Sequence, residues 1–227
     1  MAITVGNFVV TTLATGSGAP SGGHLVTSSI TPVAGDLTIL SFSSSGGSSG
    51  VTAVSGCNLT WTKIASVSAG IGIANAPNDI AVWYGVGGSP SAGTITVSTG
   101  SINTCYYQLI DVSGEASSTP IVQHSTGIEG TLGASVVVSP SLSSLGANNV
   151  AMAFATAGQG SYPGTGLSAG TSMQSITGTS YLAEVSSSVG SPTAVNAVTN
   201  TTKGIIVAFE IAVGSVATNY GSAMPFF

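Results

Sequence analysis

The sequence contains no arginine, and charged residues of all kinds make up only 4% of its 227 residues. Ordinary soluble domains carry about 25% charged residues, so serine, threonine, asparagine and glycine must supply most of the polar surface here. Lys63 and Lys203 are the only lysines, and the formal net charge is −5. Because phosphate neutralisation and attraction to anionic lipid both need clustered basic residues, the composition disfavours nucleic acid and membrane as partners.

Long apolar runs are also absent, although the mean hydropathy is +0.52. No stretch long enough to span a bilayer is free of glycine, serine or threonine, so we predict no transmembrane helix. The first residues include no basic region ahead of an apolar core, and we therefore expect no secretory signal. This favours a chain assembled in the cytoplasm where it is made, or one whose signal has been removed.

Helical patterning is missing as well, since no window shows an apolar period of 3.6 residues. Hydrophobic residues make up 43% of the chain, which argues against disorder. Valine, isoleucine and threonine are frequent and favour strands. About ten short alternating segments are separated by glycine-, serine- and proline-rich turns. We therefore predict an all-β fold, an antiparallel β-sandwich of jelly-roll-like type.

Two stretches of the sequence follow one strand plan. His24–Phe42 predicts two strands joined by a tight turn at Pro32–Asp36, and Val136–Phe154 has a similar pattern. Each copy ends in an aliphatic strand that carries an acid, Asp111 in the first copy and Glu210 in the second. We infer that the sandwich is internally duplicated and that the two acids hold a structural position.

The duplication divides the chain into parts. We expect a sandwich over residues 24–214 with pseudo-repeats 24–114 and 134–214, an N-terminal arm at 1–23 and a C-terminal tail at 215–227. Residues 115–133 would be the joint between the copies. Two small consecutive domains are the alternative, but half a sandwich would leave an apolar face bare.

A specific alignment of the copies follows from the spacing. It places Val150, Met152 and Phe154 against Thr38, Leu40 and Phe42. It also places Ala147-Asn148 against Gly35-Asp36. Since the second turn lacks a charge, we interpret Asp36 as a turn residue rather than a functional acid.

Five short motifs occur in a fixed order along the chain. They are P-x-x-G-D-L (Pro32–Leu37), L-T-W-T-K-I-A (Leu59–Ala65), A-V-W-Y (Ala81–Tyr84), G-x-I-T-V (Gly93–Val97) and Y-x-x-x-D-V-S-G (Tyr107–Gly114). The set resembles a loose family of β-sandwich domains found in phage virion proteins and bacterial surface proteins. The resemblance implies a sandwich fold, a structural or adhesive role such as capsid decoration or a fibre module, and a homotrimer. It carries no catalytic residues, and the shortage of charge in this chain departs from it.

Cys57 and Cys105 are the only cysteines. We expect two small buried thiols, because proteins assembled in the cytoplasm keep their thiols reduced. A disulfide between them is the alternative. Their spacing matches no metal-binding motif, and neither histidine is near them in sequence.

Catalytic patterns are weak in this sequence. Gly166–Gly170 matches G-x-S-x-G but lacks the flanking strand and helix that present the serine, so we interpret it as a chance match. His24 and His124 are the only histidines, and both are expected at surface or edge positions. We therefore predict no enzyme activity, no cofactor and no metal.

The seven acidic residues offer one further alternative. They are Asp36, Asp79, Asp111, Glu115, Glu129, Glu184 and Glu210. Loop carboxylates and carbonyls around Asp79 or Glu115–Glu129 would suit calcium. Asn58 and Asn200 lie in glycosylation sequons, which we interpret as incidental without a secretory signal.

Aromatic residues supply the candidate contacts. Most lie in predicted strands, where core packing is favoured over a sugar-stacking platform: Trp61, Trp83, Tyr84, Tyr106 and Tyr107. Tyr162 lies in a glycine-rich loop and is a better candidate for an exposed contact. The apolar end of the tail, with Met224, Phe226 and Phe227, is a candidate for insertion into a neighbouring subunit.

These features predict a non-enzymatic virion structural protein, a capsid decoration or cement protein at the virion surface. Its partners would be other virion subunits and further copies of itself. One alternative is a carbohydrate-binding or host-attachment module, for which a glycan would be the partner. Another is a self-assembling extracellular fibre subunit.

Overall fold

The structure is a computed structural model, and it describes residues 2–5, 7–45, 50–68, 77–100, 104–116, 118–129, 140, 142–157, 171–176, 181–186 and 204–214. These residues hold fourteen β-strands and no helix. The same part of the chain consequently offers no apolar helix of membrane-spanning length. Every pairing between neighbouring strands is antiparallel. The predicted all-β, antiparallel fold class is confirmed.

The largest sheet has six strands in the order β1-β2-β9-β4-β7-β6. Their bounds are β1 (Ala2–Val5), β2 (Phe8–Gly18), β9 (Thr104–Ser113), β4 (Leu37–Ser45), β7 (Pro77–Val86) and β6 (Thr60–Ser68). The inner strands β4 and β9 are buried on both faces, with every residue of Leu37–Ser44 and Tyr107–Val112 buried. Strands with only one covered face would alternate in exposure, so this sheet must be covered on both sides.

A five-stranded sheet covers one face of the six-stranded sheet. Its order is β10-β14-β11-β13-β12, with β10 (Ile121–Glu129), β14 (Gly204–Ile211), β11 (Val150–Ala157), β13 (Tyr181–Ser186) and β12 (Thr171–Ile176). One apolar core lies between the two sheets and includes Ile39, Ile110, Met152 and Val207. The Phe154 and Phe209 rings stack within it, with centroids 6.1 Å apart. The two large sheets therefore form a sandwich with a shared core.

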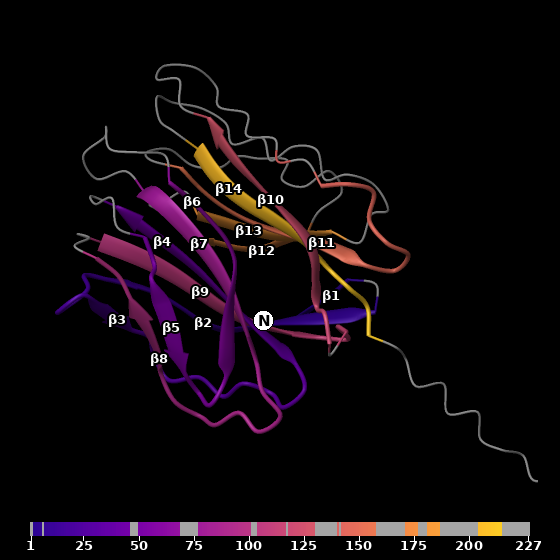
Figure 1. Cartoon of the computed structure of the whole chain (residues 1–227), viewed down its shortest axis with the longest axis horizontal. Helices are drawn as coiled ribbons and strands as arrows, with labels where there is room; N and C mark the ends of the chain where they lie inside the picture. Colours follow the sequence, from indigo (N-terminus) through magenta and orange to yellow (C-terminus); the bar gives the residue numbers. More distant parts are fainter. Residues whose placement is uncertain are drawn as a thin grey trace, which may run out of the picture.

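A small third sheet covers the other face of the six-stranded sheet. It has the order β3-β8-β5, with β3 (His24–Val26), β8 (Ile95–Ser98) and β5 (Ala53–Gly56). A second core between them includes Leu40, Phe42, Ile95 and Val97. The molecule therefore has three layers, with the six-stranded sheet in the middle (Figure 1). The sequence patterns did not predict this third layer.

Five strands of each large sheet follow the same plan. The order across the first sheet is β2-β9-β4-β7-β6, and the order across the second is β10-β14-β11-β13-β12. In both, the strands that are first, last, second, fourth and third along the chain follow one another across the sheet. The third sheet is built from strands inserted into the first set. This correspondence supports the internal duplication, which remains a prediction together with the jelly-roll description. It also extends each copy upstream to β2 and β10.

The alignment of the two copies was wrong by one residue. Leu37 pairs with Val112 on β9, and Val150 pairs with Ile211 on β14, so Val150 corresponds to Leu37 rather than to Thr38. A shift of one residue turns every side chain to the opposite face of a strand. Val150 faces the sandwich core as Leu37 does, whereas Thr38 lies on the other face of the sheet, toward the third layer.

The described part of residues 1–23 does not form an arm. β2 lies between β1 and β9 inside the six-stranded sheet, and its Phe8 and Val10 are buried in the sandwich core. The alternation of apolar residues in this segment gives β2 a buried face, which explains why it pairs with its own chain. Likewise, residues 115–133 include the strand β10, where a joint was expected.

Candidate functional site

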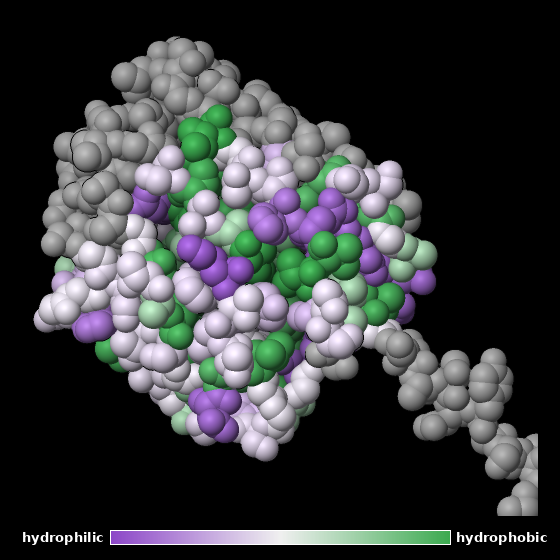
Figure 2. Space-filling model, viewed as in Figure 1, coloured by the Kyte–Doolittle hydropathy of each residue, from purple (hydrophilic) through white to green (hydrophobic). Residues whose placement is uncertain are grey.

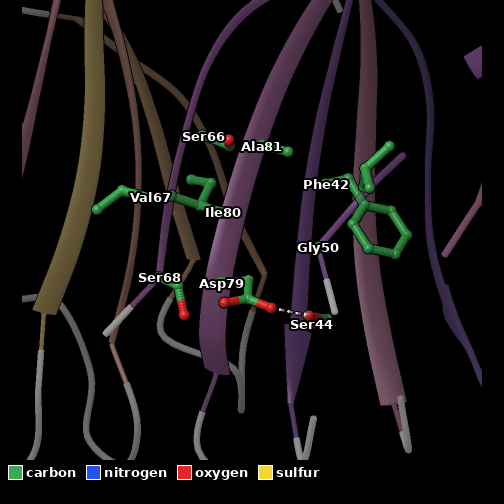
Figure 3. Close-up of a pocket in the computed structure, with 10 residues that line it drawn as sticks. Phe42, Ser44, Gly50, Ser66, Val67, Ser68, Asp79, Ile80 and Ala81 are labelled. Carbon is green, nitrogen blue, oxygen red and sulfur yellow. Dashed lines mark hydrogen bonds between the residues drawn. The ribbon is translucent and has the colours of Figure 1, made fainter. Parts of the chain in front are cut away.

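A cavity of about 270 Å³ lies on the third-layer face of the six-stranded sheet. It occupies the end of that face where β4 and β6 end and β7 begins. Two cross-strand rows line it, Ser44–Asp79–Ser68 and Phe42–Ala81–Ser66 (Figure 3). Val51 also lines the cavity. Ser66 and Ser68 are exposed, so the cavity is open to solvent.

Asp79 is the one charged side chain among the described residues that line this cavity, and it is only 6% exposed. Its Oδ2 accepts a hydrogen bond from the Ser44 hydroxyl at 3.4 Å. Its Oδ1 accepts no hydrogen bond from the described residues, although the Ser68 hydroxyl points toward the carboxylate (Figure 3). Burial raises the pKa of Asp79, and the Ser68 and Ser44 hydroxyls offset part of that rise. A buried carboxylate with an unfilled acceptor is costly, and one that lines a cavity is a candidate for a binding position.

A second cavity of about 320 Å³ lies at the opposite end of the six-stranded sheet. Asp36, Val86 and Glu115 line it. Burial raises the pKa of Glu115 to about 7, and the nearby Asp36 and Asp111 carboxylates add to the rise. Burial also raises the pKa of Asp36. This end of the molecule therefore concentrates negative charge that is partly removed from water.

These carboxylates do not assemble into a metal site. Within the described ranges, no group of three or more histidines, cysteines and acids is arranged to hold a metal ion. Asp79 and Glu115 line different cavities. The calcium alternative therefore gains no geometric support from the described residues, which do not include the Glu129 side chain.

Asp111 is buried on β9, where it holds the turn that precedes β4. Its Oδ2 accepts the backbone N–H of Val33 at 2.9 Å, and its Oδ1 accepts the Thr38 hydroxyl at 2.7 Å. The turn closes through a hydrogen bond from Asp36 N to Val33 O, and Gly35 has a φ of 90°. Asp36 is therefore a turn residue, as expected.

Glu210 holds a similar turn, the one that precedes β11. Its Oε1 accepts the Gly146 N–H and the Asn149 side-chain amide, each at 2.7 Å. Asn149 N donates to Gly146 O, and Asn148 has a φ of 64°. The residues that match Gly35-Asp36 are therefore Asn148-Asn149, not Ala147-Asn148. The structural interpretation of Asp111 and Glu210 agrees with these contacts.

The two histidines lie on different sheets. His24 is exposed on β3, and its Nδ1 lies 3.2 Å from the Ser98 hydroxyl. His124 is exposed on β10. Among the described residues no carboxylate is hydrogen-bonded to either ring, so they form no hydrolytic triad. The G-x-S-x-G stretch at Gly166–Gly170 lies outside the described residues.

Most of the strand aromatics contribute to packing. Trp83 and Tyr107 are buried in the core beneath the third sheet. The Tyr107 hydroxyl accepts the Ser28 N–H at 3.0 Å, and the Trp61 indole N–H donates to Gly56 O at 3.3 Å. Trp61, Tyr84 and Tyr106 are half-buried. Tyr162, Met224, Phe226 and Phe227, the candidate partner contacts, lie outside the described residues.

Both cysteines are buried and free, as expected, and the disulfide alternative is contradicted. Each thiol faces a backbone carbonyl instead, with Cys105 Sγ 2.9 Å from Gly18 O and Cys57 Sγ 3.9 Å from Thr94 O. Burial raises the pKa of Cys105 to about 11 and also raises that of Cys57. Neither sulfur is therefore activated as a nucleophile.

The outer strand β10 is the exposed feature that the sequence patterns missed. It is the edge of the five-stranded sheet, and its Val122 and Ile128 side chains are 52% and 50% exposed. Lysines, prolines and bulges usually protect such edges. β6, the nearby edge of the six-stranded sheet, has Lys63 and a bulge beside it, whereas the bulge of β10 is confined to its first residues, at Ile121/Gln123. The available signal was the set of β-branched residues at Ile121, Val122, Thr126 and Ile128, which favour a strand.

Compared with models of known protein families, with curated proteins and with solved structures, the chain matches none of them at a significant level.

Proposed function

We propose that the chain is a non-enzymatic structural subunit that acts by packing against further copies of itself and against neighbouring subunits, as virion decoration proteins do. The β10 edge is the observation that carries this proposal. Its backbone groups on the outer side have no strand beside them among the described residues, and two of its side chains are exposed aliphatics. An edge of this kind is a template for pairing with another chain.

The surface chemistry supports the same function. Few charges are available to repel a second copy, and polar contacts would come from hydroxyl groups and strand edges. Figure 2 shows hydrophobic residues over the region where β10 ends and β14 begins, among weakly polar neighbours. The virion setting comes from the sequence resemblance, and the edge strand supports subunit packing.

Native mass spectrometry over a concentration series tests the proposal. We expect the wild-type chain to form a closed oligomer, a trimer by the resemblance or a dimer if two β10 strands pair about a twofold axis. Ile128→Lys should shift the population toward monomer, because a charge would be buried in the new contact.

Val26→Lys is the matched control, since Val26 is equally exposed but lies on β3 in the third sheet. It should leave the oligomer intact. A wild-type chain that stays monomeric at every concentration would contradict the proposal, and so would an Ile128→Lys variant that assembles as well as the control.

A further inference from the structure

We propose that the cavity beside Asp79 binds a primary ammonium group carried on a short aliphatic chain. The proposal is independent of the subunit packing suggested above, because the cavity lies on the six-stranded sheet and not on β10. One buried carboxylate, the hydroxyl groups around it and the apolar walls define the site.

The carboxylate requires a donor. Asp79 is only 6% exposed, and its Oδ1 accepts no hydrogen bond from the described residues. An ionised carboxylate in this state has lost water without a full replacement. A cationic donor compensates it best, since charge-assisted hydrogen bonds are about twice as strong as neutral ones.

The described part of the chain does not supply this cation itself. The Lys63 Nζ lies over the Trp83 ring, 5.8 Å from its centroid. Trp83 is four residues further along β7 than Asp79, a distance of about 13 Å in an extended strand. Lys63 is therefore held away from the carboxylate.

The surroundings match an ammonium better than other cations. An ammonium has three N–H donors, and the hydroxyl oxygens of Ser44 and Ser68 flank Asp79 as further acceptors (Figure 3). Calcium would need six or more oxygen ligands, and a single carboxylate beside apolar walls does not provide them.

The apolar walls define the rest of the ligand. Phe42, Ala81 and Val51 line the cavity next to the row of polar side chains. These side chains would contact methylene groups and no further polar atoms. The volume of about 270 Å³ lies below the usual range for drug-sized ligands, so the aliphatic chain is short. A free alkylamine and a lysine side chain share this chemistry.

Titration with n-butylamine near neutral pH, followed by NMR or calorimetry, tests the proposal. We expect saturable binding by the amine and at least about tenfold weaker binding of n-butanol, which has the same shape but no charge. Acetyl-lysine methylamide, tested in parallel, shows whether the site also admits a lysine side chain. Binding of the free amine alone would identify a small-molecule site, and binding of both would identify a site for exposed lysines as well.

Three variants complete the test. Asp79→Asn should weaken amine binding at least about tenfold, and Ser66→Phe should do the same by filling the cavity while keeping the carboxylate. Asp36→Asn is the matched control, because Asp36 lines the other cavity, and it should leave binding unchanged. Circular dichroism confirms that each variant is folded.

Several outcomes would overturn the proposal. One is equal binding of n-butylamine and n-butanol, and another is undiminished amine binding by both Asp79→Asn and Ser66→Phe. A third is no saturable binding of n-butylamine to the wild-type chain up to about 50 mM, a limit set by the affinity that five heavy atoms can contribute. Lys203 lies outside the described residues, so Lys203→Met provides a last control. Amine binding that appears only in this variant would assign the site to the chain's own lysine and reject the proposal.

Discussion

Single carboxylates organise both ends of the sheets in this chain. Asp111 and Glu210 are almost completely buried. Each accepts the backbone N–H of the first residue of a turn, the turn before β4 for Asp111 and the turn before β11 for Glu210. Asp79 is buried and Glu115 is half-buried, and each accepts fewer hydrogen bonds. The same residue type therefore stabilises the fold where donors surround it and opposes folding where they do not.

Glu210 provides the first prediction. Burial alone would raise its pKa, but hydrogen bonds from Asn149, Gln123 and Gly146 N lower it below the usual value. A lowered pKa in the folded state means that this carboxylate stabilises the protein above about pH 4.5 and that the contribution is lost as the pH falls through the folded value. Glu210→Ala should reduce the free energy of unfolding at neutral pH by about 2–4 kcal/mol, since several buried donors lose their acceptor.

Urea denaturation at neutral and acidic pH measures this effect. Ser143→Ala is a suitable control, because Ser143 is exposed and only its backbone contacts Gln123. A Glu210→Ala variant as stable as this control would show that the turn does not depend on the carboxylate.

Glu115 should behave in the opposite way. Its pKa is raised to about 7 in the folded protein, so folding favours the protonated form and the protein loses stability as the pH rises from about 4.5 through 7. Glu115→Gln should therefore stabilise the protein at alkaline pH, by roughly 1 kcal/mol because solvent screens a half-buried group. The difference between variant and wild type should vanish at mildly acidic pH. Denaturation curves that differ equally at both pH values would exclude this titration.

At the scale of strands, the sequence predicted what local patterns determine. The turn at Pro32–Asp36 and the apolar strand in Ala81–Tyr84 followed from turn residues and hydrophobicity. β10 was missed because residues 123–127 in its middle are all polar or glycine, and an edge strand needs little apolar character. The one-residue error in aligning Val150 arose because β4 is buried on both faces, which removes the alternation that fixes register.

The strand β6 provides a prediction about edges. It lies at the edge of the six-stranded sheet, and Lys63 is exposed next to its bulge. Replacing the lysine by valine should increase self-association, because an unprotected edge strand pairs readily with another chain. Light scattering of Lys63→Val over time measures this.

Lys63→Glu is the control, since it also loses the contact with the Trp83 ring but keeps a charge at the edge. It should remain as dispersed as the wild type. Equal aggregation of both variants would mean that the contact with the ring, not the charge, protects the strand.

The candidate cavity could be predicted only in part. Asp79 was among the acids considered, as a calcium ligand in a loop. The sequence did not show that it lies near the start of β7, between Ser44 and Ser68 on the two neighbouring strands. That arrangement depends on the register in which β7 pairs with β4 on one side and with β6 on the other. Sequence spacing within one segment contains no information on such cross-strand neighbours.

For the whole molecule, the shared core between the two large sheets has a consequence for folding. Residues such as Ile39 and Val207, from the two halves of the chain, lie in one buried cluster. Neither half can bury its apolar face alone. We therefore expect the chain to unfold in a single cooperative transition, although its two large sheets share one strand order.

Phe209→Ala tests this expectation. Phe209 is fully buried in the five-stranded sheet, whereas Trp83 lies on the opposite side of the six-stranded sheet, beneath the third sheet. Tryptophan fluorescence therefore reports a region that Phe209 does not touch, while far-UV circular dichroism reports all the strands. The substitution should lower the free energy of unfolding by about 3–5 kcal/mol and shift both curves equally. A fluorescence transition that stays at the wild-type midpoint would show that the two halves unfold separately, as two consecutive domains would.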